Sequence, residues 1–203
     1  MTKNRKKDFV DYDIRVLRSR HKAIRELKRL YKPSLHGFRI WPSNWLLIDY
    51  FKHSGYARSS KIIDIGCGWG LAGIYCAKNH DSLVTCMDSD EAVFPYLHLH
   101  AAINNIEITT LKSSFEELSV QEMRKYEIII GSDICFWDKM VEVLKSLIFR
   151  AVESGIKIVA ISDPGRSSFE SLGRYFINKG KGQVVNWEID HPLHFQGRIL
   201  VIK

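Results

Sequence analysis

The protein has 203 residues, which is enough for one domain with a substantial hydrophobic core and too few for two domains of ordinary size. Its 45% hydrophobic and 26% charged content is typical of a globular chain and excludes an intrinsically disordered one. Its apolar runs are shorter than a membrane span, its first residues lack the apolar core of a signal peptide, and its four cysteines form no CxxC pair. We therefore expect a single cytoplasmic domain with reduced thiols and no membrane partner.

The net charge of +7 comes from the N-terminal segment. Residues 1–32 hold twelve Lys and Arg against four Asp and Glu, whereas the remaining residues hold eighteen against nineteen. Between Phe9 and Tyr31, apolar residues recur at helical spacing, at Ile14, Leu17, Ile24, Leu27 and Leu30. This pattern predicts a basic helical extension over residues 1–37, in front of a domain at 38–203. Such a helix would contact a phosphate backbone or an acidic protein, or would only expose a solvated face.

From Ser60 onward, short β-branched runs alternate with helical stretches. Strands are predicted at 61–66, 83–88, 106–111, 126–133, 156–163, 183–190 and 197–203. Helices are predicted at 69–80, 89–105, 138–154 and 168–180, with a short helix or loop at 115–125. Pro95 is expected to lie in the first turn of its helix or to kink it. This alternation predicts the α/β class, with a mostly parallel sheet, helices on both faces and a C-terminal antiparallel hairpin at one edge.

The residues that follow the first predicted strand form a glycine-rich loop, Asp64-Ile65-Gly66-Cys67-Gly68-Trp69-Gly70. Ligands of parallel sheets bind beyond the carboxyl ends of the strands, and glycines let the backbone approach them closely. A dinucleotide loop would read GxGxxG and would deliver a pyrophosphate to a helix N-terminus. This loop reads GxGxG, and the carboxylate of Asp64 would repel a pyrophosphate but can hold a cationic amino group. A P-loop is excluded because the chain contains no GxxxxGK[ST] motif.

The second predicted strand ends at Asp88, where an acidic side chain can accept both hydroxyls of a ribose. Asp64 and Asp88 together suit a ligand with an ammonium group, a ribose and no phosphate, and S-adenosylmethionine has these properties. The segment DIGCGWG and Asp88 resemble the first motif and the second-strand acid of the class I methyltransferases. The resemblance implies a Rossmann-like seven-stranded sheet and S-adenosylmethionine as the cofactor.

The same resemblance implies where the cofactor lies. It places Ser114 and Phe115 beside the adenine, one as a polar contact and the other through a backbone amide or ring packing. The residues expected to bind the cofactor are Trp41, Asp64, Gly66, Cys67, Gly68, Gly70, Asp88, Ser89, Ser114, Phe115 and Ser132.

The segment after the fourth predicted strand, residues 131–138, is expected to face the methyl group. It lacks the (N/D)PP(Y/F) motif of DNA adenine methylases. Cys135 lacks the preceding proline that is usual for carbon-5 pyrimidine methylases, and a small buried residue is the favoured interpretation. The residues Asp133-Ile134-Cys135-Phe136 resemble the (D/E)xx(Y/F) motif of the seven-β-strand protein-lysine methyltransferases. The Trp-Pro segment at 41–43 and the DPGR stretch at 163–166 resemble segments of the same group, the latter in the electron-transfer flavoprotein β-subunit methyltransferases.

This second resemblance implies that Asp133 and Phe136 are catalytic. Asp133 would orient an acceptor amine or accept its proton, and phenylalanine at 136 removes the hydroxyl that a tyrosine would supply. Trp41, Phe136 and Trp137 would flank cationic groups with their ring faces. Other interpretations are a helix N-cap for Asp133, although Asp138 is better placed for it, and core packing for Phe136 and Trp137. Asp163 and Arg166 would form a structural pair or would contact the substrate.

Three functions remain open from the sequence. The first is a protein methyltransferase that acts on lysine, and the second is an rRNA or tRNA methyltransferase whose N-terminal helix binds the phosphate backbone. The third is a domain that binds the cofactor without catalysis or acts on a small molecule. A metal is not expected, because His98 and His100 do not share a helical face. His191 and His194 are expected to have no acidic or cysteine partner nearby.

Overall fold

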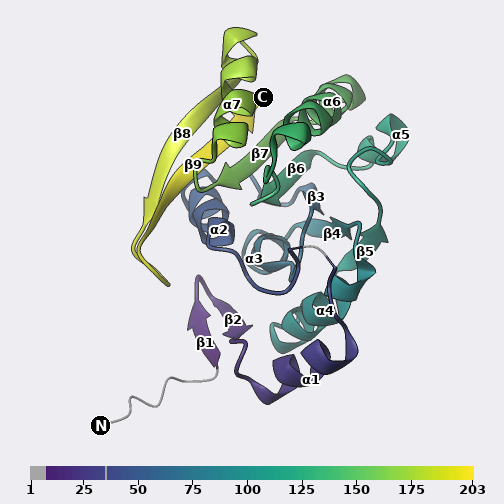
Figure 1. Ribbon diagram of the computed structural model, residues 1–203, viewed down its shortest axis with the longest axis vertical. Coiled ribbons are helices and arrows are strands. Elements are labelled where there is room, and N and C mark those ends of the chain that lie inside the picture. Colours follow the sequence, from purple (N-terminus) through teal and green to yellow (C-terminus); the bar gives the residue numbers. More distant parts are fainter. Residues whose placement is uncertain (1–7, 35) are drawn as a thin grey trace.

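The computed structural model describes residues 8–34 and 36–203, so Leu35 and residues 1–7 of the predicted extension lie outside the described residues. Figure 1 shows one central sheet of seven strands, in the order β5-β4-β3-β6-β7-β9-β8. The strands are β3 (Lys61–Ile65), β4 (Leu83–Asp88), β5 (Thr109–Lys112), β6 (Ile128–Ser132), β7 (Ile158–Asp163), β8 (Gly182–Ile189) and β9 (Phe195–Ile202). The first five are parallel, whereas β9 is antiparallel to both β7 and β8. The predicted α/β class, the Rossmann-like sheet and the C-terminal hairpin are confirmed.

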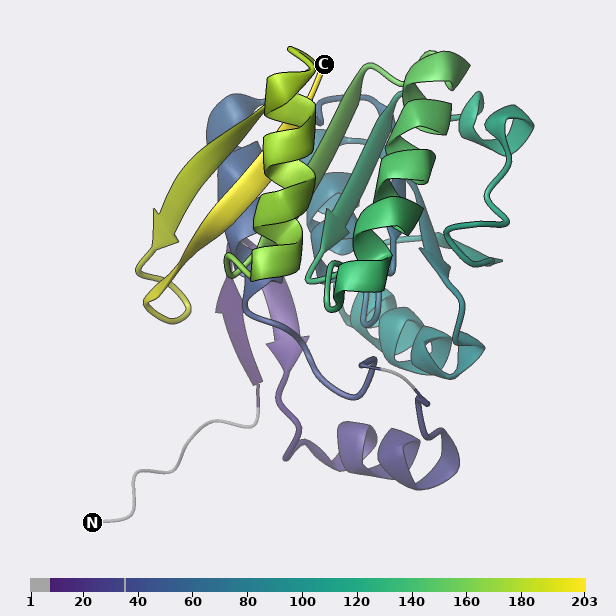
Figure 2. The ribbon, with the colours of Figure 1, turned by 45° about the horizontal axis from the view of Figure 1, so that its top comes forward.

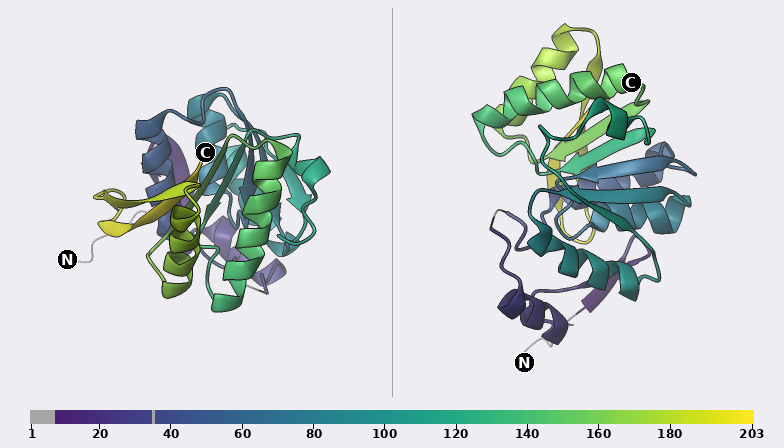
Figure 3. Two further views of the ribbon diagram at one scale, coloured as in Figure 1. Left: turned by 90° about the horizontal axis from the view of Figure 1, so that it is seen from above. Right: turned by 90° about the vertical axis from the view of Figure 1, so that its right-hand side faces the viewer.

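Helices cover both faces of this sheet (Figure 3). One core contains buried residues of α2 (Ser43–Ser54), α3 (Leu71–His80) and α4 (Phe94–Ile103), and the other contains those of α5 (Val120–Met123), α6 (Asp138–Ser154) and α7 (Ser167–Asn178). The central strands β3, β6 and β7 are therefore apolar on both sides, as their continuous runs of isoleucine and valine require.

The order of the strands reverses between β3 and β6. The chain leaves β3 towards β4 and β5, and then returns to pair β6 with the other edge of β3, at Ile62–Ile128. The connections on the two sides of this point run over opposite faces of the sheet. A crevice therefore opens beyond the carboxyl ends of β3 and β6, where ligands of such sheets bind.

The prediction of one helix from Phe9 to Tyr31 is wrong for its first half. Residues 8–17 form an antiparallel hairpin of β1 (Asp8–Asp11) and β2 (Ile14–Leu17), and helix α1 covers only Lys22–Leu30. Tyr12 and Asp13 turn the chain with φ angles of 48° and 59°, as in the tight turns of β-hairpins. The spacing of Ile14 and Leu17 fits a helix, but the β-branched residues Ile14 and Val16 alternate with exposed Arg15, which is the period of a strand.

Tertiary contacts hold this hairpin on the domain. The side chain of Asn104 accepts a hydrogen bond from Arg15 N at 2.7 Å and donates one to Arg15 O at 2.8 Å, so an edge of β2 is paired. The hydroxyl of Tyr12 donates to Asp49 of α2 at 2.9 Å. Because the apolar residues of β2 belong to the same core as α2 and α3, the hairpin is packed against the sheet's helices. The boundary at residue 37 stays a prediction.

Two further elements differ in extent from the predictions. The helix predicted over 89–105 begins as a 3-10 turn, η1 (Glu91–Val93), and continues as α4 with Pro95 in its first turn, as predicted. The segment 115–125 contains only the four-residue helix α5. Within residues 8–34 and 36–203, none of the helices has the length and apolar character needed to cross a membrane.

Truncation of Ile14 tests the packing of the hairpin. Ile14 is 1% exposed, whereas Val10 on the partner strand is 67% exposed. We expect Ile14→Ala to lower the free energy of unfolding by about 2–5 kcal/mol, because it leaves a cavity in the core. Val10→Ala should change it by less than about 0.5 kcal/mol. Urea denaturation followed by tryptophan fluorescence measures both, and equally small effects would show that the hairpin is not packed on the domain.

Candidate active site

A cavity of about 240 Å³ lies in the crevice beyond β3, β4 and β6. Ten of the residues predicted to form the site line it: Trp41, Gly66, Gly68, Asp88, Ser89, Ser114, Phe115, Ser132, Asp133 and Phe136. Three predicted residues, Asp64, Cys67 and Gly70, lie in the loop below it and are not part of its lining. The crevice thus brings together side chains from the ends of four strands and from the segment before α2.

Two glycines of the loop show why the backbone needs them. Gly66 and Gly68 have φ angles of 63° and 52°, in the left-handed region. A Cβ at Gly66 would lie 2.7 Å from a methyl group of Ile134 and 3.3 Å from the ring of Phe115. A Cβ at Gly68 would meet no protein atom within 4 Å, although Gly68 lines the cavity. The loop therefore leaves open space at Gly68, against which a ligand can lie.

Asp64 lies beneath this loop with 1% of its surface exposed. Its Oδ2 accepts a hydrogen bond from Gly73 N at 3.2 Å, in the first turns of α3. Burial raises the pKa of Asp64 to about 7, because ionisation would place a charge in a dry environment. The carboxylate thus ties β3 to α3, and its predicted contact with a cationic amino group stays a prediction. Burial also raises the pKa of the Cys67 thiol, which lies beside Cys86.

Asp88 ends β4 at the rim of the cavity. Its Oδ2 accepts a hydrogen bond from Gly68 N at 3.1 Å, and its Oδ1 accepts one from Asp90 N at 3.0 Å. These two amides orient the carboxylate, and burial raises its pKa above the usual value. Each oxygen keeps a lone pair for a further donor, so a pair of ribose hydroxyls matches the arrangement.

Ser114 and Phe115 lie on the neighbouring side of the cavity, after β5. The hydroxyl of Ser114 accepts a hydrogen bond from Glu117 N at 3.3 Å, and Glu117 accepts one from Ser114 N at 2.9 Å. This reciprocal pair has the form of a capping box and fixes the turn. The ring of Phe115 faces Gly66 and closes the cavity next to the glycine loop.

Asp133 follows β6 on the opposite side of the cavity. It is 3% exposed and has a φ of 57°, which a non-glycine residue adopts only at a cost in energy. Its Oδ1 forms an ion pair with Arg166 at 2.7 Å, and its Oδ2 accepts a hydrogen bond from Ser43 N at 3.2 Å. Arg166 also pairs with Asp163 at 2.7 Å, so one guanidinium joins both carboxylates. Asp133 is therefore not a helix cap, and Arg166 is bound to the end of β6 as well as to β7.

Aromatic rings surround the same end of the cavity. Phe136 stacks on His36 with 4.1 Å between ring centroids, and Trp41 and Trp137 lie 5.7 Å and 5.9 Å from it. The guanidinium of Arg166 lies 4.7 Å from the centroid of Phe136. Phe136 and Trp137 both line the cavity, and their predicted roles beside a cationic group stay predictions.

The segment that joins β6 to α6 corrects one expectation and supports another. Helix α6 begins at Asp138, but Trp137 occupies the cap position and makes no side-chain capping bond, so the predicted cap at Asp138 is wrong. Cys135 is fully buried, and burial raises the pKa of its thiol to about 11. A thiol of that pKa is a poor nucleophile at neutral pH, in line with the predicted structural role.

The cavity also contains residues that were not predicted: His36, Gly37, Asp90, Val93, Ser113, Glu116, Ile134 and Met140. Most of them are adjacent in the sequence to predicted residues, so their closeness to the motifs could have identified them. His36 and Gly37 carry no motif. They reach the site because Trp69 Nε1 donates to Gly37 O and Trp41 Nε1 donates to His36 O, each at 2.8 Å.

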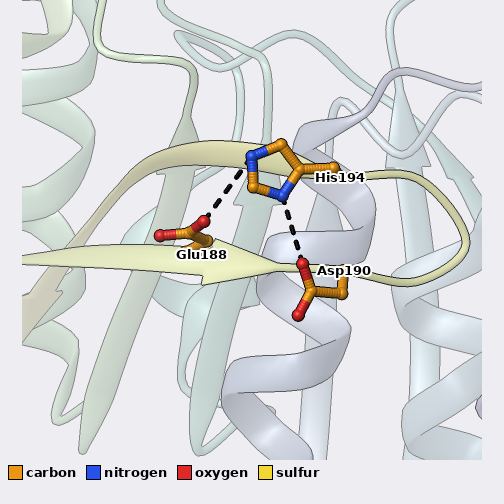
Figure 4. A group of neighbouring side chains, drawn as sticks. All are labelled: Glu188, Asp190 and His194. Atoms are coloured by element: carbon orange, nitrogen blue, oxygen red, sulfur yellow. Dashed lines mark hydrogen bonds and ion pairs between the residues drawn. The ribbon is translucent and has the colours of Figure 1, made fainter.

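The hairpin of β8 and β9 contains a second group of titratable side chains (Figure 4). Glu188, Asp190 and His194 bring ligand atoms within 4.8 Å of one another, and all three are exposed. His194 lies 3.1 Å from Asp190 and 3.6 Å from Glu188. The expectation that His194 has no acidic partner is therefore wrong, since the turn between the strands folds both carboxylates onto it.

Comparison with known proteins agrees with this geometry. A family described as lysine methyltransferase matches residues 31–173, which is more than half of the chain. The protein belongs to the lysine methyltransferase family. The match includes the glycine loop, Asp88 and Asp133, and it confirms the predicted resemblance to the class I methyltransferases, whose cofactor is S-adenosylmethionine.

Two curated relatives and one solved structure are similar to this member of the lysine methyltransferase family. It is 26% identical over 132 residues to the electron transfer flavoprotein beta subunit lysine methyltransferase of Xenopus laevis, covering 64% of this chain and 53% of that protein. It is 31% identical over 129 residues to the histidine protein methyltransferase 1 homolog of Dictyostelium discoideum, covering 60% of this chain and 41% of that protein. The chain thus spans about half the length of these relatives.

The solved structure is magnesium protoporphyrin IX methyltransferase from Synechocystis PCC 6803 with bound S-adenosylmethionine. The TM-score is 0.58 at 16% sequence identity, and the match covers 78% of this chain and 76% of that one. This likeness shows that the fold is shared.

The residues of the cavity fit S-adenosylmethionine. The space in front of Gly68 is open, and the oriented carboxylate of Asp88 has lone pairs for ribose hydroxyls. Ser89, Ser114, Phe115 and Phe136 line the same cavity. Their predicted positions beside the adenine and the reactive end of the cofactor stay predictions.

A methyl group added at Gly68 tests this assignment. We expect Gly68→Ala to weaken S-adenosylmethionine binding by about tenfold or more, because the new Cβ occupies the space against which the cofactor lies. Gly55 is a matched control, since its φ is 67°, its Cβ would also meet nothing within 4 Å, and it lies at the end of α2. Both variants should lose about 1–2 kcal/mol of stability from the left-handed backbone. Calorimetric titration with the cofactor measures the affinities, and equal affinities for the two variants would contradict the assignment.

Proposed function

We propose that the protein transfers a methyl group from S-adenosylmethionine to a side-chain nitrogen of another protein, and that this side chain is lysine. The observation that carries the proposal is the carboxylate of Asp133. Arg166 and Ser43 hold it in one orientation at the aromatic end of the cavity, 2.7 Å and 3.2 Å from its two oxygens. A carboxylate accepts hydrogen bonds, so it can position a substrate nitrogen that carries protons.

The acceptor must be neutral before it can react. S-adenosylmethionine, when bound, supplies a methyl group attached to a positively charged sulfur. A lysine amine has a reference pKa of about 10.4, and desolvation next to a positive charge lowers it. The lysine ammonium must therefore lose one proton before the attack, for which Asp133 offers a path to water. The neutral nitrogen would then form its bond to the methyl carbon as the carbon–sulfur bond breaks, which leaves a methylammonium side chain and a neutral thioether.

Asp133 is suited to orient this amine because its carboxylate cannot turn. One oxygen is fixed by the Arg166 guanidinium and the other by a backbone amide, and each retains a lone pair for the amine protons. Alignment of a nucleophile with the methyl carbon is the main task of such a site.

The ring faces around Asp133 suit a cationic side chain. Trp41, Phe136 and Trp137 line the cavity, and aromatic faces attract ammonium groups and exclude water. The names of the two curated relatives, which describe methylation of lysine and of histidine in proteins, support a protein side chain as the acceptor. The RNA alternative rested on one long basic helix, of which the hairpin at residues 8–17 replaces the first half, while α1 keeps the second half. The cytoplasmic location stays a prediction.

Substitution of Asp133 tests the proposal. Incubation of a cell lysate with the protein and radiolabelled S-adenosylmethionine should label a protein band that protease removes and nuclease does not. Mass spectrometry should find the methyl group on lysine. We expect Asp133→Asn to lower the labelling rate at least about a hundredfold, a typical contribution of a positioned acid–base group. Its affinity for S-adenosylmethionine should stay close to that of the wild type.

Asp138→Asn is the matched control, because Asp138 is exposed in the first turn of α6 and does not line the cavity. It should label at the wild-type rate. Full labelling by Asp133→Asn would show that this carboxylate is not needed, and a label that nuclease removes would favour RNA as the substrate.

The pH dependence separates lysine from histidine as the acceptor. The neutral fraction of a free lysine, with a pKa of about 10.4, rises tenfold with each pH unit between 7 and 9, whereas free histidine, with a pKa of about 6.5, is already mostly neutral. Because kcat/KM reports the free forms, we expect it to climb steeply across this range for a lysine acceptor. Initial rates at low acceptor concentration measure it, with cofactor affinity determined at each pH. A plateau above pH 7 would point to histidine.

A further inference from the structure

A second recess lies beside the active-site cavity, with a volume of about 460 Å³. We call it the arginine groove. Three segments that are distant in the sequence form it: the N-terminal hairpin with the turn that follows it, residues 39–40, and the loop between β8 and β9. Figure 2 shows the purple hairpin next to the yellow β8–β9 loop, and the Tyr12 hydroxyl, which donates to Asp49, lies 3.2 Å from His191 O. Trp45 of α2 and Trp69 of the glycine loop also line it.

The arginine groove and the active-site cavity share one wall. In the segment 36–41, His36, Gly37 and Trp41 line the cavity, whereas Arg39 and Ile40 line the groove. The guanidinium of Arg39 lies 3.8 Å from the ring centroid of Trp41. A chain bound in the groove would therefore lie next to the aromatic end of the cavity, where the acceptor side chain is proposed to enter.

The charge of the groove has one sign. Arg18, Arg20 and Arg39 are exposed, and its lining contains no aspartate or glutamate. Among the residues that the structure describes, none of these three arginines forms an ion pair. Of the acids near the groove, Asp8 is paired with Arg15 at 2.6 Å and Asp190 with His194 at 3.1 Å. The three guanidiniums are thus available to carboxylates of a partner.

The apolar part of the groove favours a protein over a nucleic acid. Trp45 and Trp69 are each only 3% exposed, so they cannot offer ring faces on which bases would stack. The ring of Phe9 is covered by Arg18, whose guanidinium lies 4.6 Å from its centroid. Leu193 is 38% exposed and leaves an apolar edge that a leucine-sized side chain can contact.

We propose that the arginine groove binds an acidic segment of the protein that is methylated, with carboxylates on Arg18, Arg20 and Arg39 and an apolar side chain between them. This inference rests on the proposed function, because it takes a protein as the acceptor. The groove holds a substrate segment on one side of the segment 36–41 while the acceptor side chain enters the cavity on the other.

The binding of a model peptide tests the groove. The probe is a fluorescein-labelled decapeptide of alternating glutamate and leucine, measured by fluorescence anisotropy with the full chain. The same peptide with glutamine in place of glutamate, and an oligonucleotide of ten uridines, serve as comparisons. We expect binding of the acidic peptide to weaken about tenfold or more in Arg18→Glu/Arg20→Glu, since attraction becomes repulsion at two contacts. Arg39→Gln should weaken it by a smaller factor.

The control is Lys179→Glu/Lys181→Glu, which makes the same change in net charge at exposed residues at the end of α7, outside the groove. It should reduce binding of the peptide less than twofold at physiological salt, where distant charges are screened. An equal loss in both double variants would overturn the inference, and so would equal affinity for the glutamine peptide. Binding of the oligonucleotide with the same dependence on Arg18 and Arg20 would also overturn it.

Labelling of the lysate separates this inference from the proposed function. The variant Arg18→Glu/Arg20→Glu should keep its affinity for S-adenosylmethionine and should raise KM for the labelled protein while kcat stays unchanged. If that variant labels protein with the wild-type KM, the groove inference fails and the proposed function stands. If the wild type labels no protein but the acidic peptide binds as described, the proposed function fails and the groove remains a site for acidic segments.

Discussion

The guanidinium of Arg166 joins two carboxylates, Asp133 directly after β6 and Asp163 at the end of β7, and the site depends on this link. Asp133 and Asp163 are both buried, and two uncompensated negative charges there would be costly. Arg166 contacts each at 2.7 Å. The network extends to α2, because Ser43 N donates to Asp133 and Ser43 O accepts a hydrogen bond from Ser162 of β7 at 2.7 Å. The network therefore fixes Asp133, whose backbone is in the left-handed region, together with the ends of β6 and β7 and the N-terminus of α2.

The sheet determines what lies opposite this network. Because the strand order reverses between β3 and β6, the glycine loop and Asp133 face each other across a crevice instead of lying on one surface. On one side of the crevice, the backbone amides of the glycine loop and the carboxylate of Asp88 suit a polar ligand. The other side carries the aromatic rings around Phe136 and the carboxylate of Asp133. A cofactor and an acceptor can thus meet in the middle with little water between them.

The N-terminal segment gains a different meaning from its structure. Its basic residues are not spread along one helix, since the chain turns at Tyr12 and places Arg18 and Arg20 after β2. Packing of β2 against α3 and α4 brings these arginines to the same recess as Arg39. The segment is thereby a candidate for substrate recognition beside the cavity, because Arg18 and Arg20 line the arginine groove.

From Lys61 onward, the sequence by itself determined the order of strands and helices, the glycine-rich loop and the acid at Asp88, because these depend on local periodicity and on motifs of adjacent residues. Before Lys61 it indicated neither the β1–β2 hairpin nor helix α2. It also indicated Asp133 and Phe136 as neighbours of the reacting atoms. Only the tertiary structure decided that Arg166 holds Asp133, that His36 stacks on Phe136 and that residues 8–17 form a hairpin. These features depend on contacts between distant segments, such as Asn104 with the edge of β2, and no local pattern encodes the partner.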